Sequence, residues 1–445
     1  MRLFKSLFKA FLLAAFFVPL FLDIGPIGIS TWTGPFLALI YIRLSEWSIG
    51  KSRHNKIRIG TWEASGLLFI TWMYISTFIN SYHHPYSNRD GLLFVYSLSI
   101  LFAMFVRRNW GSLFRTSTVA RLGFAMIAVQ SVIGSLQFLT SSTVGFPAKY
   151  FGTGGSASLL ENKDAVRVIG TLDSTPTVLG RAISIFLPFV AIYPPGSSPR
   201  FGQRIYRVIA LIAGVVVILL TQSRSAALVV GGVGGLWLLQ RLIANLRRAA
   251  RLRVTWEGLY FSYFLVVAFG GGVVAMQQVG GISYIQQAVT STVYRFETVA
   301  ILGTRFELMR GAVILFQEQP ILGNGYLSTM YLAEQTDILV PPWRSFLRVH
   351  NAYLQFLAEG GLIGFLSYSY FTIYPIYRLW KSNIRNKKIY YPFIIAVLMI
   401  LFFSQSSTAY DRYSLAPLYM MILGGAMGVV DVSESRPFRG SMREE

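Results

Sequence analysis

The chain has 445 residues, of which 53% are hydrophobic and 13% are charged. In a soluble domain about a quarter of the residues are charged. This composition therefore excludes an ordinary soluble protein and predicts an all-α, polytopic membrane protein. The formal net charge is +21 and there is no cysteine. The lack of cysteine excludes disulfides, a thiol nucleophile and a cysteine-ligated metal.

Twelve apolar runs are long enough to cross the hydrocarbon core, which takes about 17 to 25 helical residues. The first run lacks a small-residue cleavage site and is interpreted as a retained helix rather than a signal peptide. The expected helices cover residues 8–23, 27–44, 62–80, 91–106, 118–139, 175–193, 205–221, 224–243, 257–276, 350–377, 390–407 and 413–431.

Most of the 40 Lys and Arg residues fall in alternate connections between these runs. Because cytoplasmic loops are rich in Lys and Arg, both termini and these connections are expected in the cytoplasm, against anionic lipid. The positive charge is therefore explained by topology, and no nucleic-acid partner is expected. The basic segments are the N-terminus, 43–58, 107–121, 200–207, 241–253, 378–388 and 436–443.

The pattern predicts one integral membrane domain over residues 1–445, with a smaller outer loop at 140–174 and a long one at 277–349, between the ninth and tenth helices. A connection this long is usually functional. Within it, residues 303–320 have apolar positions at helical spacing, and Pro320 follows as a stop. This segment is predicted to be an amphipathic helix on the outer membrane surface, with Phe306, Met309, Val313 and Phe316 on its apolar face.

His350 stands at the outer mouth of the tenth expected helix, next to Asn351. One interpretation is structural: a polar residue here, Asn351 included, caps the helix. The other is functional: a neutral imidazole acts as a general base near neutral pH. Glu359 falls about 180° around the helix from His350, so it is a poor partner for the histidine.

A carboxylate inside a bilayer needs a partner. At about 1.5 Å per residue, Arg181 lies about 9 Å and Glu359 about 14 Å below the outer helix ends. These depths predict a structural ion pair between Arg181 and Glu359.

Arg224 interrupts the apolar stretch 205–243 within "TQSRS" and runs against the bias of positive charge to the inside. It is either an arginine reaching for the membrane interface or, beside hydroxyl groups, a ligand for phosphate oxygens. Arg305, at the head of the amphipathic segment, offers a second guanidinium. Arg310, Arg348 and Asn351 are candidates for an electropositive approach to the site, although a solvated surface explains the two arginines equally well.

Several common motifs are missing from the outer segments: DxD, HExxH, the Walker loop and GxSxG. No metal and no cofactor are therefore expected. "GTGGS" at 152–156 and "GNG" at 323–325 are interpreted as flexible turns.

Four stretches resemble the bacterial O-antigen ligase and polymerase superfamily: "GTLDSTPTVLGRAISIFLPF" (170–189), "LLTQSRSAALVV" (219–230), "TRFELMRGAVILFQEQPILGNGY" (304–326) and "HNAYLQFLAEGGLIGFL" (350–366). The resemblance covers roughly the C-terminal two thirds of the chain, and the last stretch is the most specific. The first five helices match in hydropathy alone.

This resemblance implies a GT-C-like glycosyltransferase of the bacterial inner membrane, active on the periplasmic face. It implies that His350 deprotonates an acceptor hydroxyl, which attacks the donor glycan, and that Arg224 and Arg305 stabilise the departing undecaprenyl diphosphate. The acceptor is expected to be lipid A core oligosaccharide, as in an O-antigen ligase. A polymerase that extends the glycan itself is the alternative, and a protein hydroxyl is a further acceptor. From another class, a flippase for lipid-linked oligosaccharides would share the phosphate ligands.

Overall fold

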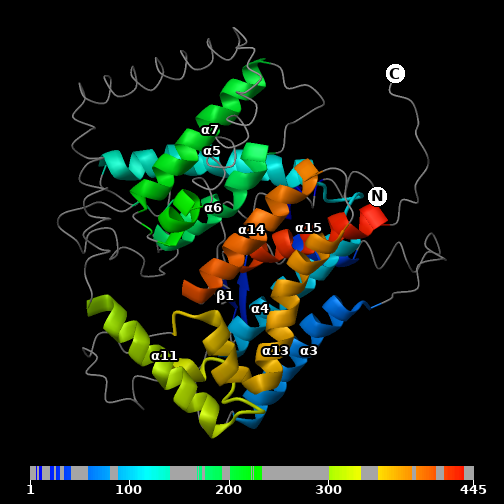
Figure 1. Ribbon diagram of the computed structural model, residues 1–445, viewed down its shortest axis with the longest axis vertical. Helices are drawn as coiled ribbons and strands as arrows, with labels where there is room; N and C mark the ends of the chain where they lie inside the picture. The colour runs from blue at the N-terminus through cyan, green and yellow to red at the C-terminus, as the bar shows by residue number, and fades with distance from the viewer. Residues whose placement is uncertain are drawn as a thin grey trace, which may run out of the picture.

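A computed structural model describes a large part of the chain as helices joined by short turns (Figure 1). The expected helix at 257–276 and most of the long loop at 277–349 lie outside the described residues. The described residues are 7, 10–12, 21–24, 27–30, 35–41, 59–80, 89–140, 168, 170–172, 176–192, 201–221, 223, 225–232, 300–331, 349–382, 387–406 and 415–434.

The observed helices confirm most of the expected apolar runs that fall on described residues. Residues 225–232 are also helical, so a turn separates them from the helix that ends at Leu220, as the "TQSRS" sequence predicts. The helices are α3 (Thr61–Ile79), α4 (Arg89–Arg108), α5 (Thr116–Thr140), α6 (Pro176–Ile192), α7 (Phe201–Leu220), α11 (Ala300–Glu318), η3 (Ser328–Tyr331), α13 (Ala352–Lys381), α14 (Lys387–Ser406) and α15 (Ala416–Glu434).

Apart from turns and one isolated bridge, the described residues are helical except for two short strands near the N-terminus. Strands β1 (Phe21–Ile24) and β2 (Ile27–Ser30) pair antiparallel, with Phe21 opposite Ser30 and Ile24 opposite Ile27. The prediction that helices extend through these residues is wrong. Proline removes a backbone donor and disfavours a continuous helix, and the Gly-Pro pair between the strands is a turn signal.

The helices form two groups joined by α14 (Figure 1). Helices α5, α6 and α7 pack on one another, and α3, α4, α13 and α15 form the second group. Helix α14 packs against α6 on one side and against α13 and α15 on the other. The result is one continuous apolar core that includes residues from both groups.

Helices α4 and α15 approach each other closely because α15 has glycines on the contacting face. A side chain at Gly424 would meet the backbone of Ala103, and one at Gly428 would meet the side chain of Trp110. Small residues four apart allow such close packing between helices in membranes.

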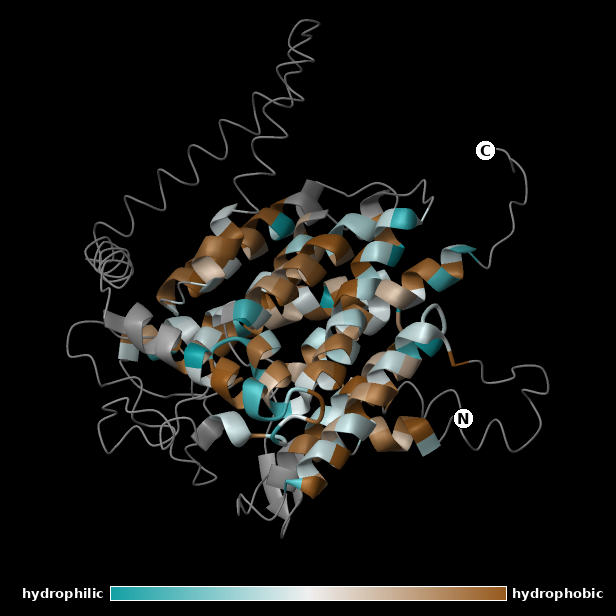
Figure 2. Cartoon of the chain, turned by 60° about the horizontal axis from the view of Figure 1, so that its bottom comes forward, coloured by the Kyte–Doolittle hydropathy of each residue, from teal (hydrophilic) through white to brown (hydrophobic). Residues whose placement is uncertain are grey.

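Hydrophobic residues predominate along the described helices in Figure 2. Helices α5 and α15 are long and apolar enough to cross a membrane, and shorter apolar helices cover Thr177–Ala191, Ile205–Leu220 and Ile389–Gln405. The expectation of about twelve membrane spans remains a prediction.

Helix α11 confirms the helix that the sequence predicts around residues 303–320, and the placement of its expected apolar face on the membrane surface remains a prediction. Leu308, Ala312 and Leu315 are buried, whereas Val313 is 39% exposed. The helix therefore has one apolar face against the protein and further apolar side chains on the surface. A pattern of apolar residues on two sides does not reveal from sequence which side a neighbouring helix covers.

Candidate functional site

Helix α13 is broken at Gly361, where the backbone has φ 61° and ψ −162°. The expected continuous span at 350–377 is therefore wrong at this position. A side chain at Gly361 would also collide with the carbonyl oxygen of Ile321. This backbone region is almost exclusive to glycine, so the Gly360–Gly361 pair divides α13 into a short first part and a longer second part.

The backbone groups freed by this break are satisfied by the turn that follows α11. The amides of Asn324 and Gly325 donate to the carbonyls of Ala358 and Glu359, at 3.0 and 2.9 Å. The amide of Leu362 donates to the carbonyl of Pro320 at 2.8 Å. Irregular backbone at membrane depth requires such internal partners. We call residues 320–325, together with the broken segment 358–362, the clamp.

Two further features make the clamp specific. Asn324 Nδ2 donates to the carbonyls of Leu315, at 2.6 Å, and Ala358, at 3.1 Å. Gly323 and Gly325 have positive φ values of 77° and 88°, and a side chain at Gly323 would collide with the carbonyl of Glu359. The interpretation of "GNG" as a flexible turn is therefore wrong, because its backbone and its asparagine side chain are hydrogen-bonded.

The end of α3 holds the other side of the clamp. Trp72 Nε1 donates to the carbonyl of Gly360 at 2.8 Å, and Ser76 Oγ donates to the carbonyl of Glu359 at 3.0 Å. Asn80 Nδ2 reaches the carbonyl of Gly323 at 3.0 Å. Helix α3 thus fixes the position of the break.

Glu359 is fully buried beside the break. Thr329 Oγ1 donates to its Oε1 at 2.5 Å, and Gln355 Nε2 lies 3.1 and 3.2 Å from its two oxygens. Arg181 is buried in α6, where its Nη2 donates to Ser225 Oγ at 3.4 Å and its guanidinium lies 5.5 Å from the ring centre of Phe403. These contacts join Glu359 to Thr329 and Gln355, and Arg181 to Ser225 and Phe403. The ion pair between Arg181 and Glu359 remains a prediction.

At the mouth of α13, Asn351 is the helix cap. Its Oδ1 accepts hydrogen bonds from the amides of Tyr353 and Leu354, at 3.0 and 3.1 Å. The structural interpretation therefore holds for Asn351. His350 precedes the cap in a bend and is half-buried.

Helix α11 and the first part of α13 run in the same direction. Val349 and Ala358 share a buried apolar cluster with Leu308, Ala312 and Leu315, and Asn324 ties Leu315 to Ala358. The C-terminal ends of the two helices are thus joined at the clamp. Their N-terminal ends consequently lie on the same side of the molecule.

The structure describes the positions of two of the four candidate arginines, Arg305 and Arg310. Arg305 belongs to the second turn of α11, one turn before Leu308, and Arg310 is exposed on the same helix. Arg224 and Arg348 lie outside the described residues, although Thr221 and Ser223, in the "TQSRS" sequence, are buried. The structure therefore brings the helix that contains Arg305 to the helix that follows His350.

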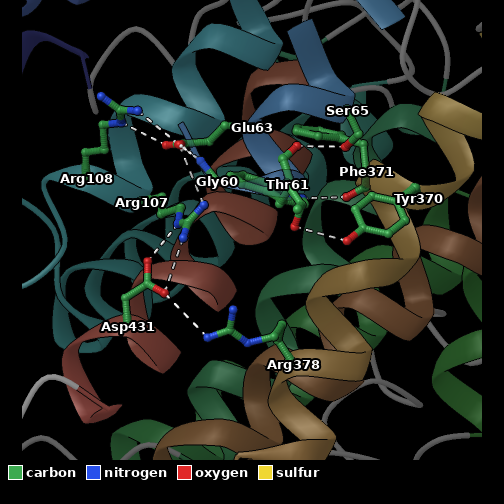
Figure 3. Close-up of polar contacts among 11 residues, drawn as sticks. Gly60, Thr61, Glu63, Ser65, Arg107, Arg108, Tyr370, Phe371, Arg378 and Asp431 are labelled. Carbon is green, nitrogen blue, oxygen red and sulfur yellow. Dashed lines mark hydrogen bonds and ion pairs between the residues drawn. The ribbon is translucent and has the colours of Figure 1, made fainter. Parts of the chain in front are cut away.

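The opposite end of α3 and α13 carries an ionic network (Figure 3). Glu63 accepts hydrogen bonds from Arg108 Nε at 2.8 Å and from the amide of Gly60 at 3.1 Å. Arg107 Nε binds Asp431 at 2.7 Å. The hydrogen bond to Glu63 raises the pKa of Arg108, because it stabilises the charged guanidinium.

Arg378 extends this network to the end of α13. Its Nη2 lies 2.7 Å from Glu434 Oε2 and 3.8 Å from Asp431 Oδ1. We call Glu63, Arg107, Arg108, Arg378, Asp431 and Glu434 the ionic network. It joins four helix ends, of α3, α4, α13 and α15, which the Lys and Arg bias predicts to lie on one side of the membrane.

Sequence reasoning missed the clamp, although two signals marked it. The first is Pro320 followed by Gly323 and Gly325, which is a turn pattern. The second is the adjacent pair Gly360 and Gly361 within an apolar helix. In the part of the chain that the structure describes, no three His, Asp or Glu side chains gather as metal ligands would. The expectation of a metal-independent site remains a prediction.

Comparison with known proteins finds a family match over the region that contains the clamp. Residues 209–369 match the family described as O-Antigen ligase. An uncharacterized protein of Haemophilus influenzae is 29% identical over 119 residues, which cover 25% of this chain and 30% of that protein. The family match includes α11, the clamp, His350 and the first part of α13.

Proposed function

We propose that this chain, whose residues 209–369 match the family described as O-Antigen ligase, is a membrane glycosyltransferase that transfers a glycan from undecaprenyl diphosphate to an acceptor hydroxyl. The acceptor is lipid A core oligosaccharide, so the product is lipopolysaccharide. The observation that carries the proposal is that the family match includes helix α11 and the first part of α13, which pack against each other. Arg305 lies in α11, and His350 lies just before α13.

In this reaction His350 takes the proton from the acceptor hydroxyl. The oxygen then attacks the anomeric carbon of the donor glycan, and the bond from that carbon to the phosphate oxygen breaks. Undecaprenyl diphosphate leaves with the bonding electron pair. A positioned base contributes about 10²- to 10⁴-fold to such a step.

The developing negative charge on the leaving diphosphate is met by Arg224 and Arg305. Helix N-termini attract anions, and the N-terminal ends of α11 and of the first part of α13 lie on the same side. Arg310, Arg348 and Asn351 line the approach. Fixed cationic groups at this place stabilise the transition state without metal or cofactor.

The site faces the periplasm, and the ionic network faces the cytoplasm. Single cysteines test this orientation, because the chain has none of its own. A cysteine replacing the exposed Gln317 of α11 should react with an impermeant maleimide in intact spheroplasts, and one replacing the exposed Ser112 should react after lysis alone. The reverse pattern would contradict the proposed orientation.

The purified protein in detergent tests the reaction against transport. An enzyme joins the lipid-linked donor to the acceptor with no membrane to cross. Scrambling of the donor in vesicles, with no transfer to core oligosaccharide in detergent, would favour a flippase. Surface glycans of a deletion strain then identify the acceptor: unmodified core with polymer left on the lipid indicates a ligase, and chains of one repeat indicate a polymerase.

A further inference from the structure

The clamp is a densely hydrogen-bonded feature near the proposed site, and glycosyl transfer as proposed does not use it. It joins three separate parts of the chain: the end of α3, the turn after α11 and the break in α13. Asn324 is its central side chain. This residue is only 8% exposed, and both hydrogens of its amide group point to backbone carbonyls.

The two carbonyls bound by Asn324 belong to different helices. Leu315 lies near the end of α11, and Ala358 lies near the end of the first part of α13, with Nδ2 at 2.6 and 3.1 Å from their oxygens. This side chain therefore joins the two helices directly and, together with the backbone hydrogen bonds of the clamp, limits how far α11 can slide along α13. Any such slide would shift position 305 relative to position 350 by the same amount.

We propose that Asn324 is a positioning residue, which sets the register of α11 against α13 and thereby the separation of Arg305 from His350. This inference rests on the proposed function of those two residues. Transfer reactions are sensitive to such geometry, since a misplacement of about 1 Å can cost on the order of 10²-fold in rate.

Register is measured directly with two spin labels. Gln317 is exposed on α11, and Leu357 is half-buried in the first part of α13. Cysteines at these positions carry nitroxides in a chain that has no other cysteine. Pulsed electron spin resonance should give one narrow distance distribution for the parent protein and a broadened or shifted one for Asn324→Ala.

Activity is measured on the same folded fraction, isolated by size exclusion. Asn324→Ala should lower kcat by about 10- to 100-fold and change the KM for the lipid-linked donor much less, because the arginines that hold the diphosphate are still present. Asn324→Gln retains the amide group and should recover part of the loss. Asn109→Ala is the matched control: Asn109 is 5% exposed, and its Nδ2 binds the carbonyl of Phe105 at the far end of α4.

An unchanged distance distribution in Asn324→Ala would overturn the proposal, and so would a broadened distribution with unchanged kcat. An equal loss of kcat in Asn109→Ala would reduce Asn324 to a general contribution to stability and also overturn it. The proposed chemistry fails separately, if His350→Ala in the parent background retains full transfer.

Discussion

The two ends of α3 and α13 are held together by different chemistry. At one end, Arg108 and Arg378 bind carboxylates on neighbouring helices, and Asp431 is 36% exposed. At the other end, backbone carbonyls and amides around Gly361 bind each other and neutral side chains. The buried carboxylate of Glu63 is compensated by its ion pair with Arg108, whereas a break in a buried helix has to be satisfied by neutral hydrogen-bonding partners. The comparison predicts that the ionic network contributes modest stability and that the clamp end determines activity.

The two ends should differ most in transfer rate when one arginine is replaced by alanine at each end. Arg305→Ala should lower the rate of transfer by about 10²- to 10³-fold, the usual cost of losing one contact to developing charge. Arg115, exposed at the ionic end, is the control, and Arg115→Ala should leave the rate unchanged. Initial rates at matched membrane expression decide this prediction, and equal losses in the two variants would remove the distinction between the ends.

Gly361→Ala should destabilise the clamp end strongly. The backbone conformation alone costs a residue with a side chain about 1 to 3 kcal/mol, and the new methyl group collides with the carbonyl of Ile321. We expect a lower yield of folded protein and a lower melting temperature in detergent. Gly231→Ala is the control, since nothing lies within 4 Å of its added methyl group. If the Gly361→Ala variant has the same melting temperature as the parent protein, α13 is not broken at this residue.

Asp431→Asn should have the smallest effect. The carboxylate is partly exposed, and an exposed ion pair is worth up to about 1 kcal/mol. The melting temperature should fall slightly, less so at high salt, while transfer stays at the parental rate. A loss of transfer comparable with that of Arg305→Ala would show that the ionic network is part of the site.

The sequence predicted the features that depend on local pattern. Hydropathy located α3, α4, α5 and α6 to within a few residues, because each is a long apolar helix bounded by polar residues. The cap at Asn351 also followed from its place before an apolar helix. Arg305 and His350 were chosen as candidates separately, and the structure adds that their helices run side by side.

The sequence did not predict the features that depend on distant partners. The break at Gly361 is stabilised by Pro320, Asn324 and Gly325, which are far away along the chain, and by Trp72 from another helix. Two glycines in an apolar run are compatible with a continuous helix until those partners are known. Similarly, the pairing of β1 with β2 places a strand ladder where hydropathy alone indicates the ends of two helices.

The general base at the mouth of α13 is the central claim, and replacement of His350 by asparagine tests it most directly. Asparagine is polar and a good cap but does not take up a proton at neutral pH. His350→Asn should insert, fold and bind donor as the parent does, with a rate of transfer lower by about 10²- to 10⁴-fold. Arg115 is exposed at the far end of the helices, so Arg115→Ala should retain the rate and serves as the control. Full transfer by folded His350→Asn protein would contradict the account.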